Sequence, residues 1–161
     1  MNYYLTIPSP LGELSLLASE QGLRGVFFEQ HRYFNGVQQA QFAPELAILQ
    51  QTANQLNDYF AGKRRQFDLQ LDLQQGTVFQ QKVWRALAQI PYASTRSYAA
   101  LAQQIGQHNA SRAVGAANGR NPFSIILPCH RVIASSGKLT GYAGGLERKQ
   151  KLLQFEQSQI S

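Results

Sequence analysis

Residues 121–133 read NPFSIILPCHRVI, an apolar run that delivers a cysteine directly after a proline and directly before a histidine. In a continued extended strand, Cys129 and His130 would point to opposite faces. Proline fixes its own φ angle and has no backbone N–H, so we expect Pro128 to mark a turn at this point. We therefore predict that the turn allows Cys129 and His130 to act together in one site.

Cys129 is the only cysteine of the 161 residues, which excludes an internal disulfide. A thiol with a pKa near ~8.5 is mostly protonated at neutral pH, so a nucleophilic cysteine needs an adjacent base, and that base needs an orienting partner. His130 is the candidate base. Glu156, expected at the end of an amphipathic helix over residues 146–155, is the candidate partner.

Two other readings of these residues remain open. An unpaired cysteine often behaves as a small buried hydrophobe, so Cys129 could serve only as packing. Glu156 could be a solvated residue at the fraying end of the C-terminal helix. A tetrahedral zinc cage would require Cys129 to converge with His31, His108 and His130, and we predict no metal and no cofactor.

The charge of the chain is unevenly distributed. Residues 1–73 carry five basic and seven acidic side chains, a net charge of −2, and the remainder carries ten basic and two acidic side chains, a net charge of +8. Such a local excess suits a polyanion such as nucleic acid, although a merely soluble basic surface would look the same. No apolar run approaches the roughly 20 residues of a membrane helix, and no targeting segment is recognised, so we expect a cytoplasmic protein.

The first part of the chain has the pattern of a small α/β lobe. Strand-forming runs separated by turn residues predict an antiparallel meander, a helix with one apolar face follows, and alternating residues then predict a half-buried strand. The expected strands are 3–7, 13–18, 23–28 and 67–73, and the expected helix is 44–60. A linker near residues 74–76 would end this lobe.

From Thr77 onward the pattern is helical. Thr77 and Ser97 are candidate helix caps, the latter for a helix over residues 98–105, and a second short helix is expected over residues 110–118. Helix, glycine-containing turn and helix is the outline of a helix-turn-helix, although many helical hairpins bind no DNA. The side chains of the second helix are nearly all small, which allows close approach to a groove but offers few groups that read base edges.

The order of several motifs resembles that of the O6-alkylguanine-DNA alkyltransferase family. The resemblance extends with specific motifs from about Phe79 to Glu156, and it rests on residues 111–115 (SRAVG), 121–122 (NP), 127–133 (LPCHRVI) and 141–145 (GYAGG). It implies a suicide methyltransferase that flips O6-alkylguanine, mainly O6-methylguanine, out of duplex DNA and moves the alkyl group irreversibly onto Cys129. O4-methylthymine is a second candidate substrate.

The resemblance also implies roles for individual residues. Cys129 would accept the alkyl group, His130 would take its proton through a water molecule, and Glu156 would orient His130. Asn121 would brace the active-site turn, and Tyr98 would help to rotate the phosphate and donate to the guanine ring. DNA contacts are expected from Arg112, which would enter the base stack, and from Ser111, Ala113, Asn118 and Tyr98; the base pocket would be lined by Tyr142, Ala143 and Gly144.

Two departures from the family pattern stand out. Some relatives carry a structural zinc in the first lobe, but residues 1–73 contain no cysteine and only His31. Ser124 occupies the position of a pocket proline in some relatives, which leaves open whether bulky alkyl groups are tolerated.

The sequence therefore predicts a two-lobe α/β protein. An antiparallel-sheet lobe with a helix (residues 1–76) would pack on a mainly helical lobe (residues 77–161) that carries the helix-turn-helix and the alkyl acceptor. We expect a monomer that acts on double-stranded DNA containing O6-alkylguanine, without membrane association. Two rival functions remain: a Cys-His hydrolase, which would turn over repeatedly, and a non-enzymatic helix-turn-helix protein that binds damage.

Overall fold

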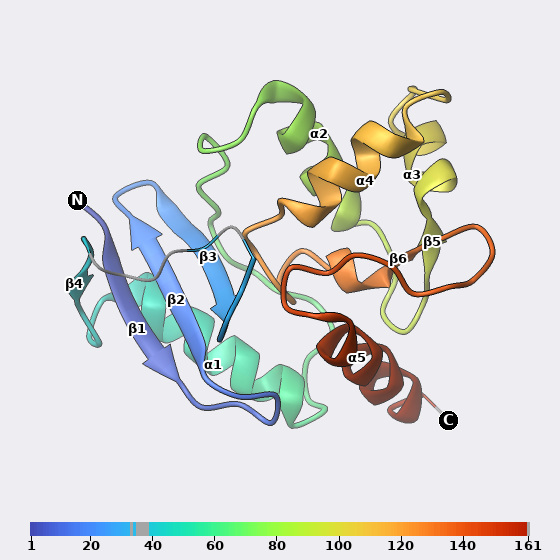
Figure 1. The fold of residues 1–161 in the computed structure, drawn as a ribbon. Coiled ribbons are helices and arrows are strands. Elements are labelled where there is room, and N and C mark those ends of the chain that lie inside the picture. Colours follow the sequence, from blue (N-terminus) through green and yellow to red (C-terminus); the bar gives the residue numbers. More distant parts are fainter. Residues whose placement is uncertain (33, 35–38, 161) are drawn as a thin grey trace. The chain divides into compact units, whose positions relative to one another are not determined.

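The computed structural model describes residues 1–32, 34 and 39–160, which fall into two compact units, Met1–Gln75 and Gly76–Ser161 (Figure 1). The described residues of the first unit form a four-stranded sheet with one helix. The second unit consists of four α-helices, a two-stranded sheet and the turn that carries the cysteine. The predicted fold class, a small antiparallel-sheet lobe and a mainly helical lobe, is confirmed.

The sheet of the first unit has the strand order β3-β2-β1-β4. β1 (Tyr3–Ile7), β2 (Leu14–Ser19) and β3 (Gly22–Phe28) form the predicted antiparallel meander, and their bounds differ from the expected ones by at most one residue. The helix α1 (Ala47–Phe60) contacts these three strands. Leu14 and Leu16 of β2 and Leu49 and Leu56 of α1 are fully buried, so the alternating strand pattern and the helical apolar face supply one core.

The predicted strand over residues 67–73 is wrong. This segment forms only an isolated parallel bridge in which Leu71 pairs with Leu23. The Leu23 amide donates to the carbonyl of Gln70 at 2.9 Å, and the Asp72 amide donates to the carbonyl of Leu23 at 2.7 Å. A Cβ atom on Gly22 would lie 2.6 Å from that Gln70 oxygen, so the close approach depends on glycine. Half-buried and exposed side chains alternate from residue 67 to residue 71 without a continuous ladder, and Asp72 is buried.

A two-residue strand that the sequence did not indicate completes the sheet. β4 (Gln41–Phe42) runs parallel to β1, and both of its residues are exposed. Two exposed residues carry no alternating pattern, which is why this strand escaped prediction. The chain then turns before α1, which begins three residues later than the sequence predicted.

Two helices of the second unit, α2 and α3, begin at the predicted caps. Thr77 forms a capping box with Gln80 at the start of α2 (Val78–Leu87), and the hydroxyl of Ser97 accepts from the Ala100 amide at the start of α3 (Tyr98–Gln104). α4 (Ser111–Gly119) follows α3 after a short connection and packs against it. The Trp84 indole donates to the carbonyl of Ala117 at 2.9 Å, which ties α2 to α4.

A small parallel sheet joins the segment before α3 to the segment that follows the Cys129 turn. β5 (Arg96–Ser97) pairs with β6 (Val132–Ile133), and Ser97 lies opposite Ile133. Ser97 therefore both caps α3 and fixes the start of that helix beside the strand that follows Cys129. The last helix, α5 (Leu146–Ser158), extends three residues beyond the predicted end and includes Glu156.

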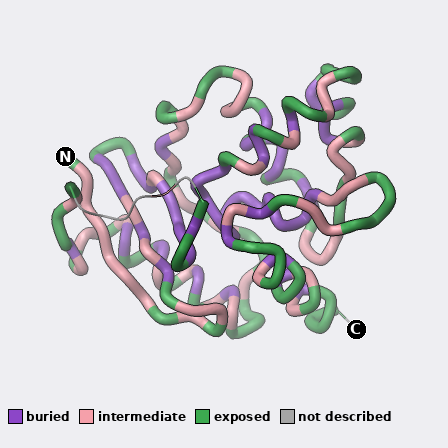
Figure 2. The backbone as a smooth tube through the Cα atoms, viewed as in Figure 1, coloured by how far each residue is buried: buried purple, intermediate pink, exposed green. Residues whose placement is uncertain are grey.

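All residues from 121 to 132 are buried, and they form the longest continuous buried stretch of the described chain (Figure 2). The apolar run read from the sequence thus forms the interior of the second unit. Among the described residues, no helix has the length and apolar character that crossing a membrane requires.

Candidate active site

The cysteine lies on a tight turn rather than on a strand. Cys129–Arg131 forms a single 3-10 turn after Pro128, and the Arg131 amide donates to the Pro128 carbonyl at 2.9 Å. Cys129 is 4% exposed and His130 is fully buried. The turn places two adjacent polar side chains inside the unit, which an extended strand could not do.

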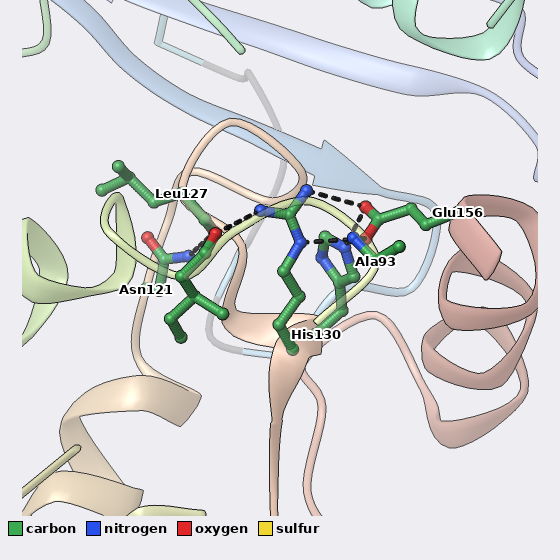
Figure 3. A network of polar contacts seen from close by, with 7 residues as sticks. Ala93, Asn121, Leu127, His130 and Glu156 are labelled. Carbon is green, nitrogen blue, oxygen red and sulfur yellow. Dashed lines mark hydrogen bonds and ion pairs between the residues drawn. The ribbon is translucent and has the colours of Figure 1, made fainter. Parts of the chain in front are cut away.

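Asn121 braces this turn through its side-chain amide. The Nδ2 atom donates to the carbonyl of Leu127 at 2.9 Å (Figure 3). The Oδ1 atom accepts from the Phe123 amide at 3.0 Å. Between these residues, Ile125 adopts a positive φ of 71°, which is unfavourable for a β-branched side chain. A buried asparagine with both ends engaged therefore holds a loop that the backbone alone would not favour.

Burial raises the pKa of the Cys129 thiol from 9.0 to about 11. The hydrogen bond from Asn121 and the positive charge of Lys149 act in the opposite direction and favour the thiolate. Because burial outweighs them, the thiol is protonated at neutral pH. Its use as a nucleophile requires a base.

His130 has the arrangement that such a base needs. Its Nε2 atom lies 2.7 Å from Oε2 of Glu156, and its Nδ1 atom is buried without a hydrogen-bond partner among the described residues. A carboxylate only accepts hydrogen bonds, so Nε2 carries the hydrogen and Nδ1 of the neutral ring is an open acceptor. Burial lowers the pKa of His130, against the opposing effect of Glu156, and this favours the neutral ring.

Glu156 is the centre of a buried polar network (Figure 3). Oε1 accepts from the Ala93 amide at 3.1 Å and from Nε of Arg131 at 2.9 Å, and Oε2 accepts from Nη2 of Arg131 at 3.0 Å as well as from His130. Burial alone would raise the pKa of Glu156, but the hydrogen bonds and charges of His130 and Arg131 outweigh it and hold the pKa well below its ordinary value. The alternative of a solvated, fraying residue is excluded, because Glu156 is fully buried.

Two buried cations of the second unit escaped the sequence analysis, Arg131 within this network and Lys149 outside it. Arg131 is 5% exposed and Lys149 is fully buried, and Nζ of Lys149 donates to the carbonyls of Val132 at 2.6 Å and Thr140 at 2.7 Å. Burial lowers the pKa of Lys149 to about 8. The signal for Arg131 was its position inside an apolar run, whereas nothing distinguished Lys149 from the neighbouring Arg148 and Lys151.

The helix α4 presents only part of the expected DNA-contacting set. Arg112 and Ala113 are exposed and Ser111 is half-buried. Asn118 is 2% exposed, and its Nδ2 donates to the carbonyl of Cys129 at 3.4 Å. Asn118 was expected to contact DNA, but it lies on the inner face of α4 and its side chain points toward the cysteine.

Tyr98 is half-buried at the first position of α3. Its hydroxyl lies 3.0 Å from the hydroxyl of Thr140, in the loop that precedes α5. A Cβ atom on Gly115 would lie 3.6 Å from the Tyr98 ring, an ordinary van der Waals distance, so this face of α4 lies close to the ring. Tyr98 thus links the two helices to the loop of the expected base pocket.

The expected pocket residues lie at the end of that loop. Tyr142 and Gly144 are buried, and Ala143 is half-buried. Burial raises the pKa of Tyr142 well above its ordinary value, and the Cys129 thiolate, were it to form, would raise it further. This electrostatic coupling places Tyr142 in the neighbourhood of the cysteine. Among the described residues, no group of three or more histidine, cysteine or acidic side chains could hold a metal ion.

Both parts of the chain match family models. Residues 2–73 match the 6-O-methylguanine DNA methyltransferase ribonuclease-like domain, and residues 78–158 match the DNA binding domain of the same family. The chain is 49% identical over 158 residues to the methylated-DNA--protein-cysteine methyltransferase of Mycobacterium bovis, which covers 98% of this chain and 94% of that protein. It is 46% identical to the protein of the same name from Methanosarcina barkeri, with 98% of this chain and 99% of the relative covered.

Solved structures give the same result. The crystal structure of Mycobacterium tuberculosis OGT in complex with DNA is 48% identical and superimposes with a TM-score of 0.90, covering 98% of this chain and 94% of that one. The structure of O6-methylguanine-DNA methyltransferase from Pyrococcus kodakaraensis, at 22% identity and a TM-score of 0.60, shares the fold. With both of its units matched and nearly its whole length aligned to these relatives, the chain belongs to the 6-O-methylguanine DNA methyltransferase family.

Proposed function

We propose that this protein repairs DNA by direct reversal, transferring the alkyl group of O6-alkylguanine to Cys129. The observation that carries the proposal is a buried thiol next to a buried neutral histidine, whose Nε2 is bonded to Glu156 and whose Nδ1 has no partner among the described residues. Membership of the family and the names of the curated relatives supply the substrate class.

The chemistry is a displacement at a saturated carbon. Nδ1 of His130 takes the thiol proton through a water molecule, Sγ of Cys129 bonds to the alkyl carbon, and the bond between that carbon and O6 breaks with its electron pair remaining on guanine. The guanine anion takes up a proton and is restored. Donors that neutralise the charge developing on guanine accelerate this step, and Tyr98 is the side chain assigned to that role.

The product is an S-alkyl thioether. It contains no acyl or ester bond that water could cleave, and no second half-reaction returns the thiol. Each protein molecule therefore acts once.

The second unit supplies the DNA-binding surface of this proposal. It includes the basic part of the chain, and Arg112 and Ala113 are exposed on α4. The nucleotide is extruded from the duplex, which costs a few kcal/mol and costs least at a damaged pair, and Arg112 fills the gap left behind. The exposed residues of α4 around Arg112 are small, so binding depends on the phosphate backbone more than on sequence. We expect the protein to act as a monomer.

The remaining assignments come from the family resemblance. Asn121 braces the reactive turn, Tyr142, Ala143 and Gly144 line the base pocket, and Ser111 contacts DNA beside Arg112. O6-methylguanine is the expected main substrate. Asn118 is not retained as a DNA contact.

A mass measurement tests the function. The protein is mixed with an excess of duplex DNA containing O6-methylguanine, and intact mass and peptide mapping follow with time. We expect uptake of one methyl group on the peptide containing Cys129 and none by a Cys129→Ser variant. Continued release of product beyond one equivalent would indicate a hydrolase, and binding without a mass change would indicate a damage-binding protein.

A further inference from the structure

Arg131 makes more contacts in the buried network than any role assigned so far requires. Three of its nitrogen atoms donate hydrogen bonds: Nε to Oε1 of Glu156 at 2.9 Å, Nη2 to Oε2 of Glu156 at 3.0 Å, and Nη1 to the carbonyl of Ile90 at 2.8 Å. The guanidinium carbon also lies 5.5 Å from the centroid of the Tyr92 ring. The forked contact to the carboxylate fixes its plane as well as its position.

The Glu156 carboxylate is filled by these contacts. A carboxylate offers about four acceptor positions, and Arg131 occupies two of them, the Ala93 amide a third and His130 the fourth. The Ala93 amide is presented from a backbone with a φ of 62°, unusual for a residue other than glycine. With every position taken, Oε2 faces His130 in one orientation only.

Arg131 also changes the electrostatics of the His130–Glu156 pair. A buried carboxylate alone would favour the charged imidazolium, and a protonated Nδ1 could not accept the thiol proton. Arg131 carries a permanent positive charge that already balances Glu156. Its charge lowers the pKa of His130, and the charge of Lys149 acts in the same direction.

We propose that Arg131 is a positioning residue for alkyl transfer, which holds both oxygens of Glu156 and balances their charge so that His130 stays neutral with Nδ1 open toward the thiol. The proposal rests on the proposed function for its meaning in the reaction. The charged groups that act on His130 are Arg131 on its own turn and Glu156 and Lys149 on α5; Cys129 precedes it in the chain, and Tyr142, in the loop before α5, couples to Cys129 and Glu156. Of these, only Arg131 contacts both oxygens of Glu156.

A matched pair of variants separates charge from structure. Arg131→Gln and Arg131→Lys both keep a hydrogen-bond donor near Glu156, but only the lysine keeps the positive charge. The protonation of His130 is followed by long-range ¹H–¹⁵N spectra of the imidazole rings, of which the chain has three. Arg85→Gln, on the exposed face of α2, removes one positive charge without touching the network and serves as the control.

In Arg131→Gln we expect the titration midpoint of His130 to rise by about one pH unit, because one nearby positive charge is lost. In Arg131→Lys and Arg85→Gln the midpoint should remain near that of the parent. The pH dependence of single-turnover methyl transfer, measured at saturating DNA, should shift with this midpoint. At an acidic pH, the rate of Arg131→Gln divided by its own plateau rate should be about tenfold lower than the same ratio for the parent. Arg131→Lys should lower the rate at every pH without shifting the acidic limb of the pH–rate profile. The lysine loses the two-point contact with the Glu156 carboxylate but keeps the positive charge.

Failure of this inference and failure of the proposed function would give different results. If the parent transfers methyl groups and the His130 midpoint is unchanged or lower in Arg131→Gln, or moves as far in Arg131→Lys, Arg131 has only a structural role and the inference is overturned. If the parent transfers none, the proposed function fails, while the spectra still decide the effect of Arg131 on His130.

If Arg131→Gln does not fold, the parent protein can be used for the test. Arg131 and His130 donate to the same carboxylate, so the Nε–H resonance of Arg131 must shift with the same midpoint as His130. A resonance that does not move during that titration would contradict the coupling proposed here.

Discussion

Nε2 of His130 lies 2.7 Å from Oε2 of Glu156, and both side chains are fully buried although 26 positions separate them in the chain. The contact joins the turn after Pro128 to the last helix of the same unit. Because each group would be costly to bury alone, the fold holds them as a pair, and Arg131 completes the balance of charge.

Replacing Glu156 with Gln should slow methyl transfer at neutral pH. The amide carries no charge to stabilise the imidazolium that forms when the thiol proton is taken, and it no longer fixes the tautomer of His130. Single-turnover rates over roughly pH 6 to 9, the window of histidine and cysteine titration, should shift toward the dependence of an ordinary thiol. A variant that reacts at the parent rate across this window would remove Glu156 from the mechanism.

The same substitution should change the dependence of stability on pH. In the folded state the pKa of Glu156 lies well below its ordinary value of 4.5. The stabilisation that the ionised carboxylate gives to the folded state is therefore complete above pH 4.5, and it is lost as the pH falls below 4.5 toward the lowered pKa. At neutral pH Glu156→Gln should lower the free energy of unfolding by about 3 to 5 kcal/mol, because Arg131 then remains buried without its partner. The difference should shrink below pH 4.5 in urea unfolding.

Glu147→Gln is the matched control on the same helix. Glu147 is 81% exposed and forms an exposed ion pair with Lys151, so its loss should change stability by no more than about 0.5 kcal/mol. Equal effects of the two substitutions would mean that burial of Glu156 contributes nothing specific.

Arg112→Ala should separate DNA binding from chemistry. As a residue that fills the stack, Arg112 should stabilise the extruded nucleotide by about 1 to 3 kcal/mol, so its loss should slow repair of duplex DNA by roughly tenfold or more. The free O6-methylguanine base lies outside any stack and should react at the parent rate. Equal losses on both substrates would assign Arg112 to the fold or the pocket instead.

Two buried asparagines of the second unit should differ in importance. Asn121→Ala leaves the Phe123 amide buried without its partner and removes one of two donors to the Leu127 carbonyl, which keeps the Cys129 amide at 2.7 Å; it should lower the free energy of unfolding by about 1 to 3 kcal/mol. Asn118→Ala removes one bond of 3.4 Å, and Oδ1 of Asn118 has no partner among the described residues, so its cost should be smaller. Thermal unfolding and methyl-transfer rates of the two variants check the order; a reversed order would show that Asn121 does not brace the turn.

Local features of the structure were accessible from the sequence because they arise from neighbouring residues. The Thr77 and Ser97 caps, the meander of β1 to β3 and the turn at Pro128 depend on side chains within a few positions of one another. The adjacency of Cys129 and His130, and the motifs around them, pointed to the family in the same way. Patterns failed where pairing is short, as in β4, or where alternation occurs without a ladder, as in residues 67–73.

Only the tertiary structure decided which polar residues are buried together. Glu156 could have been a solvated residue at the end of a helix, Lys149 was one cation among several, and Asn118 was expected to face DNA. A charge can be buried only where partners from distant segments satisfy it, and those partners include the Ala93 amide, the Ile90 carbonyl and the Thr140 carbonyl. The sequence by itself determined that Cys129 and His130 are neighbours and predicted them as nucleophile and base. The packing of α5 against the turn decided how His130 is held, because hydrogen bonds across such separations exist only in the folded chain.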